Sequence, residues 1–145
     1  VQACVESGVA EGGELVTGGR SVAGQGCYFE PTVLAGVRQQ MRVVQEEIFG
    51  PVLVASRFAD VEEALRLAND TRYGLGGSIW TRDLDTADWF GRHLEAGSVW
   101  VNVHNVIDAA LPFGGYRYSG LGHDLGEESV LANTRIKSTV VALGR

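Results

Sequence analysis

The sequence predicts an α/β protein in which helices flank an open, mainly parallel sheet. Short β-branched and aromatic runs alternate with amphipathic helical patterns from residue 52 onward, which is the order of elements in β-α units. In addition, residues 77–80 read Gly-Ser-Ile-Trp and residues 97–100 read Gly-Ser-Val-Trp, as in two copies of one unit. A helix between two such strands is the usual crossover in a parallel sheet.

The composition is that of an ordinary globular domain, with 45% hydrophobic and 21% charged residues. The formal net charge is -6 and Lys and Arg form no long block, so we expect no nucleic-acid partner. No apolar run is long enough to cross a bilayer and the first residues lack a signal-peptide pattern, so we expect no membrane partner. Having only two cysteines argues against a disulfide framework and for a reducing, cytoplasmic setting.

The first third of the chain is the least regular part of the sequence. A weak helical stripe covers residues 1–12, a short strand is expected over 14–17, and residues 25–33 are expected to be extended. The chain begins without a capping residue and its only methionine is Met41. We therefore expect a fragment or a truncated reading frame, although removal of an initiator or an engineered start would look the same.

Residues 52–103 form a more regular αβ series. Asp60 is expected to cap a helix in which Glu63 occupies the third position. A second helix, over about 83–95, contains Gly91, which costs about 1 kcal/mol relative to alanine. The expected strands of this series cover residues 52–58, 77–80 and 98–103, and the last of them is expected to be buried.

The segment after the last of these strands is predicted to form the wall of a ligand site. From His104 to Gly126 there is no period of 2 or 3.6, and Pro112 and several glycines interrupt any regular element. A long loop at the end of a parallel strand is where an open α/β sheet presents its ligands. A purely structural loop is the alternative.

The end of the chain is predicted to be a short helix over residues 126–133 and a strand from Thr134 to Leu143. In this strand Ile136 and Val140 face one side, and polar or charged side chains face the other. A terminal strand leaves one edge unpaired. Pairing with another subunit and packing against its own sheet are the two interpretations.

Spacing alone identifies no catalytic or metal-binding residue. Cys27 would need a base and a lowered pKa to act as a nucleophile, and no histidine is adjacent to it in the sequence. A small, buried, apolar role is the alternative for this cysteine. No His, Cys, Asp or Glu pair has the spacing of a metal site. The glycines at 120, 122 and 126 do not have the spacing of the dinucleotide fingerprint.

Two adjacent carboxylates, Glu46 and Glu47, lie at an expected turn, with the aromatic Phe49 two residues beyond Glu47. An ionised carboxylate only accepts hydrogen bonds, so one of them could hold both hydroxyls of a ribose diol. A solvated acidic pair is the alternative.

Several motifs, in this order and spacing, resemble the C-terminal part of the NAD(P)-dependent aldehyde dehydrogenases. They are Gly26-Cys-Tyr-Phe-Glu-Pro-Thr-Val33, Glu46-Glu-Ile-Phe-Gly-Pro51, Asn69-x-x-x-Tyr73-Gly-Leu75, Gly97-Ser-Val-Trp-Val-Asn102 and Pro112-Phe-Gly-Gly115-x-x-x-Ser119-Gly120. The resemblance extends over nearly the whole chain. It implies part of an aldehyde dehydrogenase catalytic domain over residues 1–122, followed by a short helix and an oligomerisation strand over residues 123–145.

The resemblance implies oxidation of an aldehyde to a carboxylic acid, with NAD or NADP in the complete enzyme. In this family a cysteine attacks the aldehyde and a glutamate activates the hydrolytic water, and both belong to a region that would precede Val1. Neither Cys4 nor Cys27 falls at the nucleophile's motif, so we assign no catalytic residue and expect the chain alone to be inactive. The family also implies a homo-oligomer, a dimer or tetramer, or pairing with full-length subunits.

The resemblance assigns binding roles to five residues. Glu47 matches the glutamate that holds the nicotinamide ribose, and Phe49 matches the aromatic beside it. Asn105, Ile107 and Phe113 match the loop that lines the aldehyde tunnel, and an apolar wall with one amide suits an aryl or alkyl aldehyde.

Residues 104–108 are similar to the phenylacetaldehyde-type members of the family. Arg117, His123 and Asp124 stand where the family commonly has Lys, Arg and Glu, so the family's ion pairing near the end of the loop is not carried over.

Two other functions stay open on the sequence. In one, the chain is a non-catalytic module that associates with full-length subunits through its C-terminal strand. In the other, it is an unrelated thiol enzyme that uses Cys27.

Overall fold

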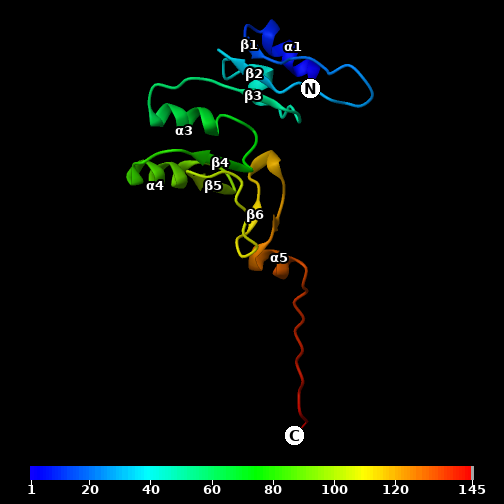
Figure 1. Cartoon of the computed structure of the whole chain (residues 1–145). Helices are drawn as coiled ribbons and strands as arrows, with labels where there is room; N and C mark the ends of the chain where they lie inside the picture. The colour runs from blue at the N-terminus through cyan, green and yellow to red at the C-terminus, as the bar shows by residue number, and fades with distance from the viewer. Residues whose placement is uncertain (145) are drawn as a thin grey trace. The chain divides into compact units, whose positions relative to one another are not determined.

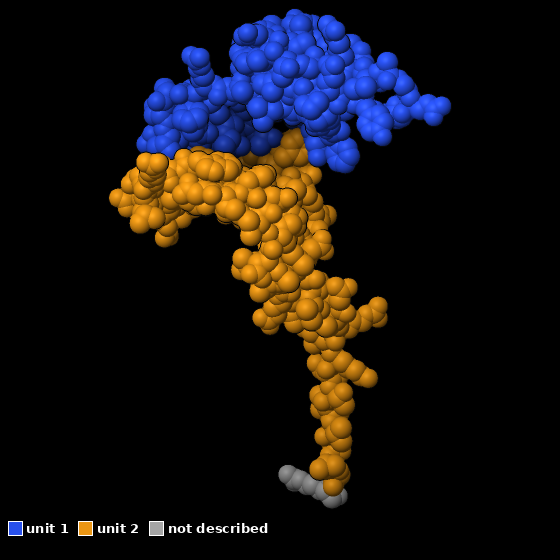
Figure 2. Space-filling model, viewed as in Figure 1, with its two compact units in different colours: residues 1–71 blue, residues 72–145 orange. Residues whose placement is uncertain are grey.

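The computed structural model describes residues 1–144 of the chain, which form one unit over residues 1–71 and another from residue 72 onward (Figure 2). Each unit combines helices with short strands, so the predicted α/β class is confirmed. The strands of the described residues form three small sheets of three, two and two strands, whereas the sequence predicts one open, mainly parallel sheet. Strand order depends on contacts between distant segments, which periodicity does not report.

A three-stranded mixed sheet organises the first unit (Figure 1). Strand β1 (Glu14–Thr17) runs antiparallel to β2 (Thr32–Ala35), and β2 runs parallel to β3 (Val52–Val54). The strand predicted over residues 52–58 is therefore shorter than expected. The helices of this unit are α1 (Gln2–Ala10), α2 (Arg42–Gln45) and α3 (Val61–Asn69).

The core of the first unit consists of buried side chains from α1, β2 and the start of α2. Its members are Val5, Leu34, Met41 and Val43. Gly8 permits the close approach of α1, because a Cβ there would lie 2.6 Å from a methyl carbon of Val43. Packing against this cluster therefore stabilises a helix whose own apolar pattern is weak.

The second unit begins with the predicted β-α-β crossover. Strand β4 (Gly76–Ile79), helix α4 (Leu84–His93) and strand β5 (Ser98–Val101) follow one another, and β4 pairs in parallel with β5. Ala87 and Phe90 are buried on the inner face of α4. The two similar tetrapeptides are thus neighbouring strands of one sheet.

Aspartates cap α3 and α4, the two helices of the regular series. The Asp60 carboxylate accepts a hydrogen bond from the Glu63 N–H, and the Asp83 carboxylate accepts one from the Thr86 N–H, each at 2.8 Å. In return, the Glu63 carboxylate accepts a hydrogen bond from the Ala59 N–H at 2.7 Å. These bonds satisfy donors that the first turn of a helix leaves free, as the sequence predicts for Asp60.

Strand β5 differs from its prediction in length and burial. It ends at Val101 and its residues are half-buried or exposed, whereas a buried strand reaching Val103 was expected. Asn102 has a φ of 56°, which turns the chain away from the strand direction.

The long segment after β5 contains more regular structure than its sequence predicts. Strands β6 (Phe113–Gly114) and β7 (His123–Asp124) form a short antiparallel pair, and a 3-10 turn covers Arg117–Ser119. Helix α5 (Gly126–Ala132) then follows, close to the predicted position.

The C-terminal segment is extended but belongs to no sheet of the described residues (Figure 1). Ile136 and Val140 are 100% and 94% exposed. The strand predicted from Thr134 to Leu143 is therefore not formed within the single chain, because a strand requires a neighbour for its backbone hydrogen bonds. Within residues 1–144, no helix has both the length and the apolar character needed to cross a bilayer.

Candidate functional site

The structure distinguishes between the two adjacent glutamates that follow α2. The Arg42 Nε donates a hydrogen bond to the Glu46 carboxylate at 2.7 Å, and this bond raises the pKa of the Arg42 guanidinium. Glu47 is exposed and has no hydrogen-bond or ion-pair partner among residues 1–144. Glu46 is therefore engaged by the helix, whereas the Glu47 carboxylate is available to a ligand.

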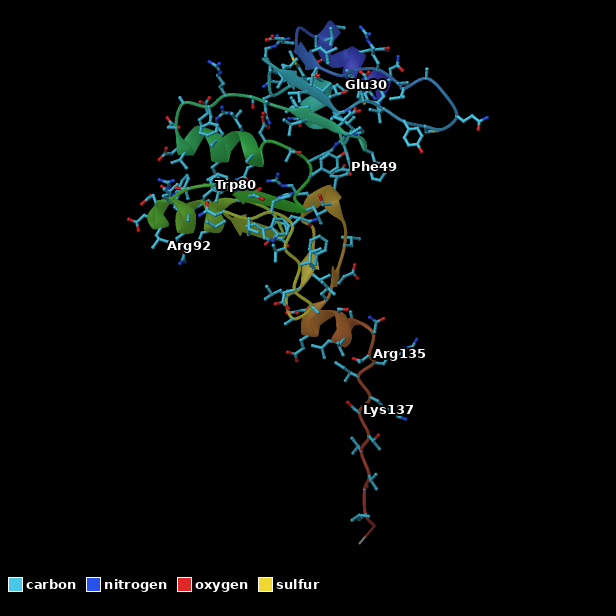
Figure 3. All side chains as sticks on the ribbon, in the orientation of Figure 1. Glu30, Phe49, Trp80, Arg92, Arg135 and Lys137 are labelled. Carbon is cyan, nitrogen blue, oxygen red and sulfur yellow. The ribbon has the colours of Figure 1, made fainter. Side chains whose placement is uncertain are left out.

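Phe49 combines a strained backbone with an exposed ring. Its φ is 51°, in the left-handed region that bulky residues rarely adopt, and it is 89% exposed (Figure 3). The neighbouring Ile48 packs against the core of the unit, and the Pro51 carbonyl accepts a hydrogen bond from the Thr32 N–H at 2.9 Å. The core and the sheet thus hold the segment on both sides of Phe49. Such strain is found preferentially at functional sites.

Hydrogen bonds hold the turn after β5 at both ends. The Asn102 side chain accepts a hydrogen bond from the Thr81 N–H at 2.9 Å and donates one to the Thr81 carbonyl at 2.8 Å. The Trp100 indole N–H donates to the Val106 carbonyl at 2.8 Å. Asn105 lies between these bonds, exposed and with a φ of 56°, so its backbone follows a defined turn.

A cavity of about 530 Å³ lies beside β5 and the loop that follows it. Ile107 and Phe113, two of the three predicted tunnel residues, line this cavity, and Asn105 is not among its lining residues. Asp108 is the one charged residue in the lining, and its carboxylate accepts a hydrogen bond from the Ala110 N–H at 2.8 Å. The other lining residues are Gly97, Ser98, Val99, Trp100, Val103, Val106, Leu111 and Pro112. A mainly apolar cavity of this size is typical of small-molecule sites.

Sequence reasoning missed Trp100 as a lining residue, and it placed Leu111 in the wall-forming segment without singling it out. The alternation of side chains along a strand places Ser98 and Trp100 on the same face, which is a signal for Trp100. Leu111 has no such signal, because the loop that carries it has no period.

The far end of the loop is held by residues that depart from the family pattern. Arg117 forms an ion pair with Glu95. Asp124, in β7, is the ladder partner of Phe113 in β6. Backbone pairing therefore positions Phe113 beside the cavity, whichever charged side chains β7 carries.

The two groups of predicted binding residues belong to different units. Glu47 and Phe49 lie in the unit of residues 1–71, and Asn105, Ile107 and Phe113 lie in the other.

The cysteine and metal interpretations find little geometric support in the described part of the chain. Cys27 is exposed, so the expectation of a small, buried, apolar residue was wrong for this position. It lies in a segment without helix or strand, between Gly26 and the isolated bridge residue Phe29, where no local chain fold shields it. Residues 1–144 contain no group of three or more His, Cys, Asp or Glu residues placed to hold a metal ion.

The sequence profile described as "Aldehyde dehydrogenase family" matches residues 1–139. Among curated proteins, the chain is 43% identical over 141 residues to aldehyde dehydrogenase family 2 member B4, mitochondrial, of Arabidopsis thaliana, covering 97% of this chain and 26% of that protein. It is 42% identical over 139 residues to a mitochondrial benzaldehyde dehydrogenase of Antirrhinum majus, covering 96% of this chain and 26% of that protein. The chain thus spans about a quarter of the length of these relatives.

Solved structures show the same similarity. The indole-3-acetaldehyde dehydrogenase AldA of P. syringae, a mutant in complex with NAD+ and IAA, superposes with a TM-score of 0.90 at 43% identity, over 98% of this chain and 29% of that one. An NAD-dependent aldehyde dehydrogenase from Sinorhizobium meliloti superposes with a TM-score of 0.91 at 41% identity, over 99% of this chain and 29% of that one. The recognised motifs, the crossover of β4 and β5 and these matches agree, and the chain belongs to the aldehyde dehydrogenase family.

Proposed function

We propose that this chain is the C-terminal part of an NAD-dependent aldehyde dehydrogenase, in which it binds the nicotinamide ribose and forms one wall of the aldehyde pocket. The observation that carries the proposal is the unpartnered Glu47 carboxylate, two residues before an exposed and strained Phe49. Two similar structures, one in complex with NAD+ and one of an NAD-dependent enzyme, support the choice of cofactor.

Glu47 and Phe49 have the chemistry that a nicotinamide nucleoside requires. The two oxygens of the carboxylate accept hydrogen bonds from adjacent ribose hydroxyls, and an ionised acceptor makes these bonds strong. With NAD bound, the exposed aromatic ring would pack beside the sugar and help to fix its position. When bound, NAD accepts the hydride from the substrate, and the two residues serve this step by fixing the position of the acceptor.

The cavity of the second unit supports an aldehyde with an aryl or alkyl body. Ile107, Phe113 and Trp100 present apolar surface to it, and burying apolar substrate surface contributes about 25 cal/mol per Å². Relatives described as benzaldehyde and indole-3-acetaldehyde dehydrogenases support this substrate class. Asn105 is proposed to contribute an amide at the edge of the pocket.

The reacting groups of the complete enzyme lie outside this chain in our proposal. Neither Cys4 nor Cys27 stands in the family's nucleophile motif, so no residue here is placed in bond formation. We further propose the division of the complete enzyme suggested by the resemblance, with residues 1–122 in the catalytic domain and residues 123–145 as a short helix and an oligomerisation strand.

A rebuilt full-length enzyme tests this function. Residues 1–139 replace the matching segment of the Sinorhizobium meliloti enzyme, and this protein, called the rebuilt enzyme below, is assayed for aldehyde-dependent reduction of NAD. We expect activity from the rebuilt enzyme and none from the chain alone. Aldehyde oxidation by the chain alone, or a folded rebuilt enzyme that neither binds NAD nor oxidises aldehydes, contradicts the proposal.

An alternative function is association without catalysis. The exposed apolar side chains of residues 134–143, Ile136, Val140 and Leu143 among them, favour it, because such a segment can add to the edge of another sheet. Both functions predict association with full-length subunits, and only the first predicts that residues of this chain control cofactor binding.

A further inference from the structure

A serine and a histidine are joined across the β4–β5 sheet of the second unit. Ser78 Oγ and His104 Nδ1 lie 2.6 Å apart, although they are 26 residues apart in the chain. Ser78 is half-buried in β4, and its ladder partner in β5 is Trp100. His104 lies just after β5, at the beginning of the turn that carries Asn105.

Trp100 connects this pair to the next part of the turn. Its indole ring packs edge-on against the His104 ring, with centroids 5.5 Å apart, and its indole N–H donates to the Val106 carbonyl at 2.8 Å. The indole lies over Gly76, where an added Cβ would approach it to 2.6 Å. A glycine at position 76 is therefore needed for the indole to occupy this position.

We propose that Ser78 and His104 are positioning residues that hold the turn of residues 102–107 against β4 and thereby select which aldehydes fit the pocket. This inference rests on the proposed function, because it deepens the role assigned there to the apolar cavity. The turn has three attachments: Asn102 to Thr81, His104 to Ser78, and Val106 to Trp100.

The central attachment, between His104 and Ser78, supports residues that line the cavity. Val106, Ile107 and Trp100 all line it, and the His104 ring lies against Trp100. Without the bond to Ser78, the His104 ring is free to move away from Trp100. Trp100 then loses one of its supports, and the hydrogen bond from its indole N–H to the Val106 carbonyl is weakened. The position of Ile107, and with it the space for a bulky substrate, would then no longer be fixed.

The attachment is tested first on the chain itself, by hydrogen exchange of the Trp100 indole N–H. Ser78→Ala removes the hydroxyl, and His104→Phe keeps a flat ring but removes Nδ1, so both should speed the exchange. Ser78→Thr retains a hydroxyl and should restore slow exchange. Ser21→Ala is the matched control, since that hydroxyl donates to Gln2 in the other unit.

The double variant Ser78→Ala/His104→Phe makes the test specific to the pair. If the two side chains act through one bond, the double variant should exchange no faster than either single variant. Unchanged exchange in both single variants, or independent additive effects, would overturn the attachment. The indole signals of Trp80 and Trp89 report whether the unit stays folded.

Selectivity is then measured on the rebuilt enzyme with phenylacetaldehyde and acetaldehyde. Ser78→Ala should lower kcat/KM for the bulky aldehyde relative to the small one by about tenfold, through KM, because misplacing a wall residue weakens positioning. The KM for NAD should not change, and Ser78→Thr should recover the ratio. An equal loss for both aldehydes, or no loss for either, overturns the selectivity role. A wild-type rebuilt enzyme without activity contradicts the proposed function instead, and the exchange measurement still decides the attachment.

Discussion

At the scale of single residues, the site depends on which polar groups already have partners. Glu46 and Glu47 have the same chemistry in the sequence, but Arg42 lies one helical turn before Glu46 and engages it. Ile48, the residue after Glu47, packs against the core, whereas Phe49 is exposed and has a positive φ. The difference between the two acids therefore arises from the position of α2.

The first prediction concerns Glu47. In the rebuilt enzyme, Glu47→Gln should lower kcat/KM for NAD by roughly tenfold to a hundredfold, the equivalent of the roughly 1.5–3 kcal/mol that hydrogen bonds to a charged group contribute. A deuterated aldehyde should show whether hydride transfer itself is slowed. Glu46→Gln is the matched control and should leave the kinetics nearly unchanged. Equal effects of the two substitutions would argue against the ribose assignment.

The second prediction concerns pH and the cap of α4. The hydrogen bond from the Thr86 hydroxyl, followed by that from the Thr86 N–H, lowers the pKa of Asp83. A lowered pKa in the folded state means that Asp83 stabilises the fold above its unfolded pKa of about 3.9, and that this contribution is lost as the pH falls through the folded value.

Thermal unfolding of the chain as a function of pH measures this effect. Asp83→Ala should lower the Tm at pH 7, and the difference from the wild type should shrink in acid. A difference in Tm that stays constant from pH 7 down to pH 2 would show that the carboxylate charge is not involved.

At the scale of elements, glycines differ in whether the surrounding atoms leave space for a side chain. Gly91 lies in the last turn of α4 with nothing within 4 Å of an added Cβ. Gly97 precedes β5, and an added Cβ there would overlap the Gly114 carbonyl oxygen. The sequence alone does not distinguish these two glycines.

The third prediction compares the two positions directly. Gly91→Ala should stabilise the chain by about 1 kcal/mol, because alanine is the better helix former and no atom opposes it. Gly97→Ala should destabilise it, since the backbone at Gly114 must move away, with β6 and the neighbouring Phe113. Urea unfolding of both variants measures the difference. Destabilisation by Gly91→Ala would show that α4 packs more closely there than described.

The fourth prediction concerns the cap of α3. Asp60→Ala should cost about 1 kcal/mol, as removal of an N-cap usually does, whereas Asp60→Asn should retain most of the stability. The urea midpoint of the chain is the measurement. Equal losses in the two variants would mean that the charge, and not the hydrogen bond to the Glu63 N–H, is what stabilises the helix.

At the scale of the whole molecule, much apolar surface is left uncovered for a chain of this length. Leu53 and Phe58 of the first unit are 61% and 62% exposed, and Ile136 and Leu143 of the C-terminal segment are 100% and 89% exposed. Exposed apolar side chains are what contacts with further polypeptide would cover, in agreement with a chain that spans about a quarter of the length of its relatives.

The fifth prediction follows from this exposure. The chain should co-elute with the rebuilt enzyme on a sizing column, and removal of residues 134–145 should abolish the association while leaving the folded units intact. Circular dichroism of the shortened chain is the control. Association that persists without residues 134–145 would contradict their assignment as an oligomerisation strand.

Elements whose causes are local could be predicted from the amino-acid sequence. The cap at Asp60, the β-α-β order of residues 76–101 and the short helix α5 were readable because capping and periodicity involve residues a few positions apart. The family was also readable, from several motifs in one order. Glu47, Phe49, Asn105, Ile107 and Phe113 remain predictions as binding residues.

Features that depend on distant partners became visible only in the tertiary structure. It divided the strands into three small sheets, ended β5 at Val101 and left residues 134–143 without a strand partner. It also brought Ser78 and His104 within hydrogen-bond distance. It gave Glu46 a partner in Arg42 and left Glu47 without one among the described residues. Hydrogen bonds and packing between residues far apart in the chain have no period, so only the folded arrangement of the backbone reveals them.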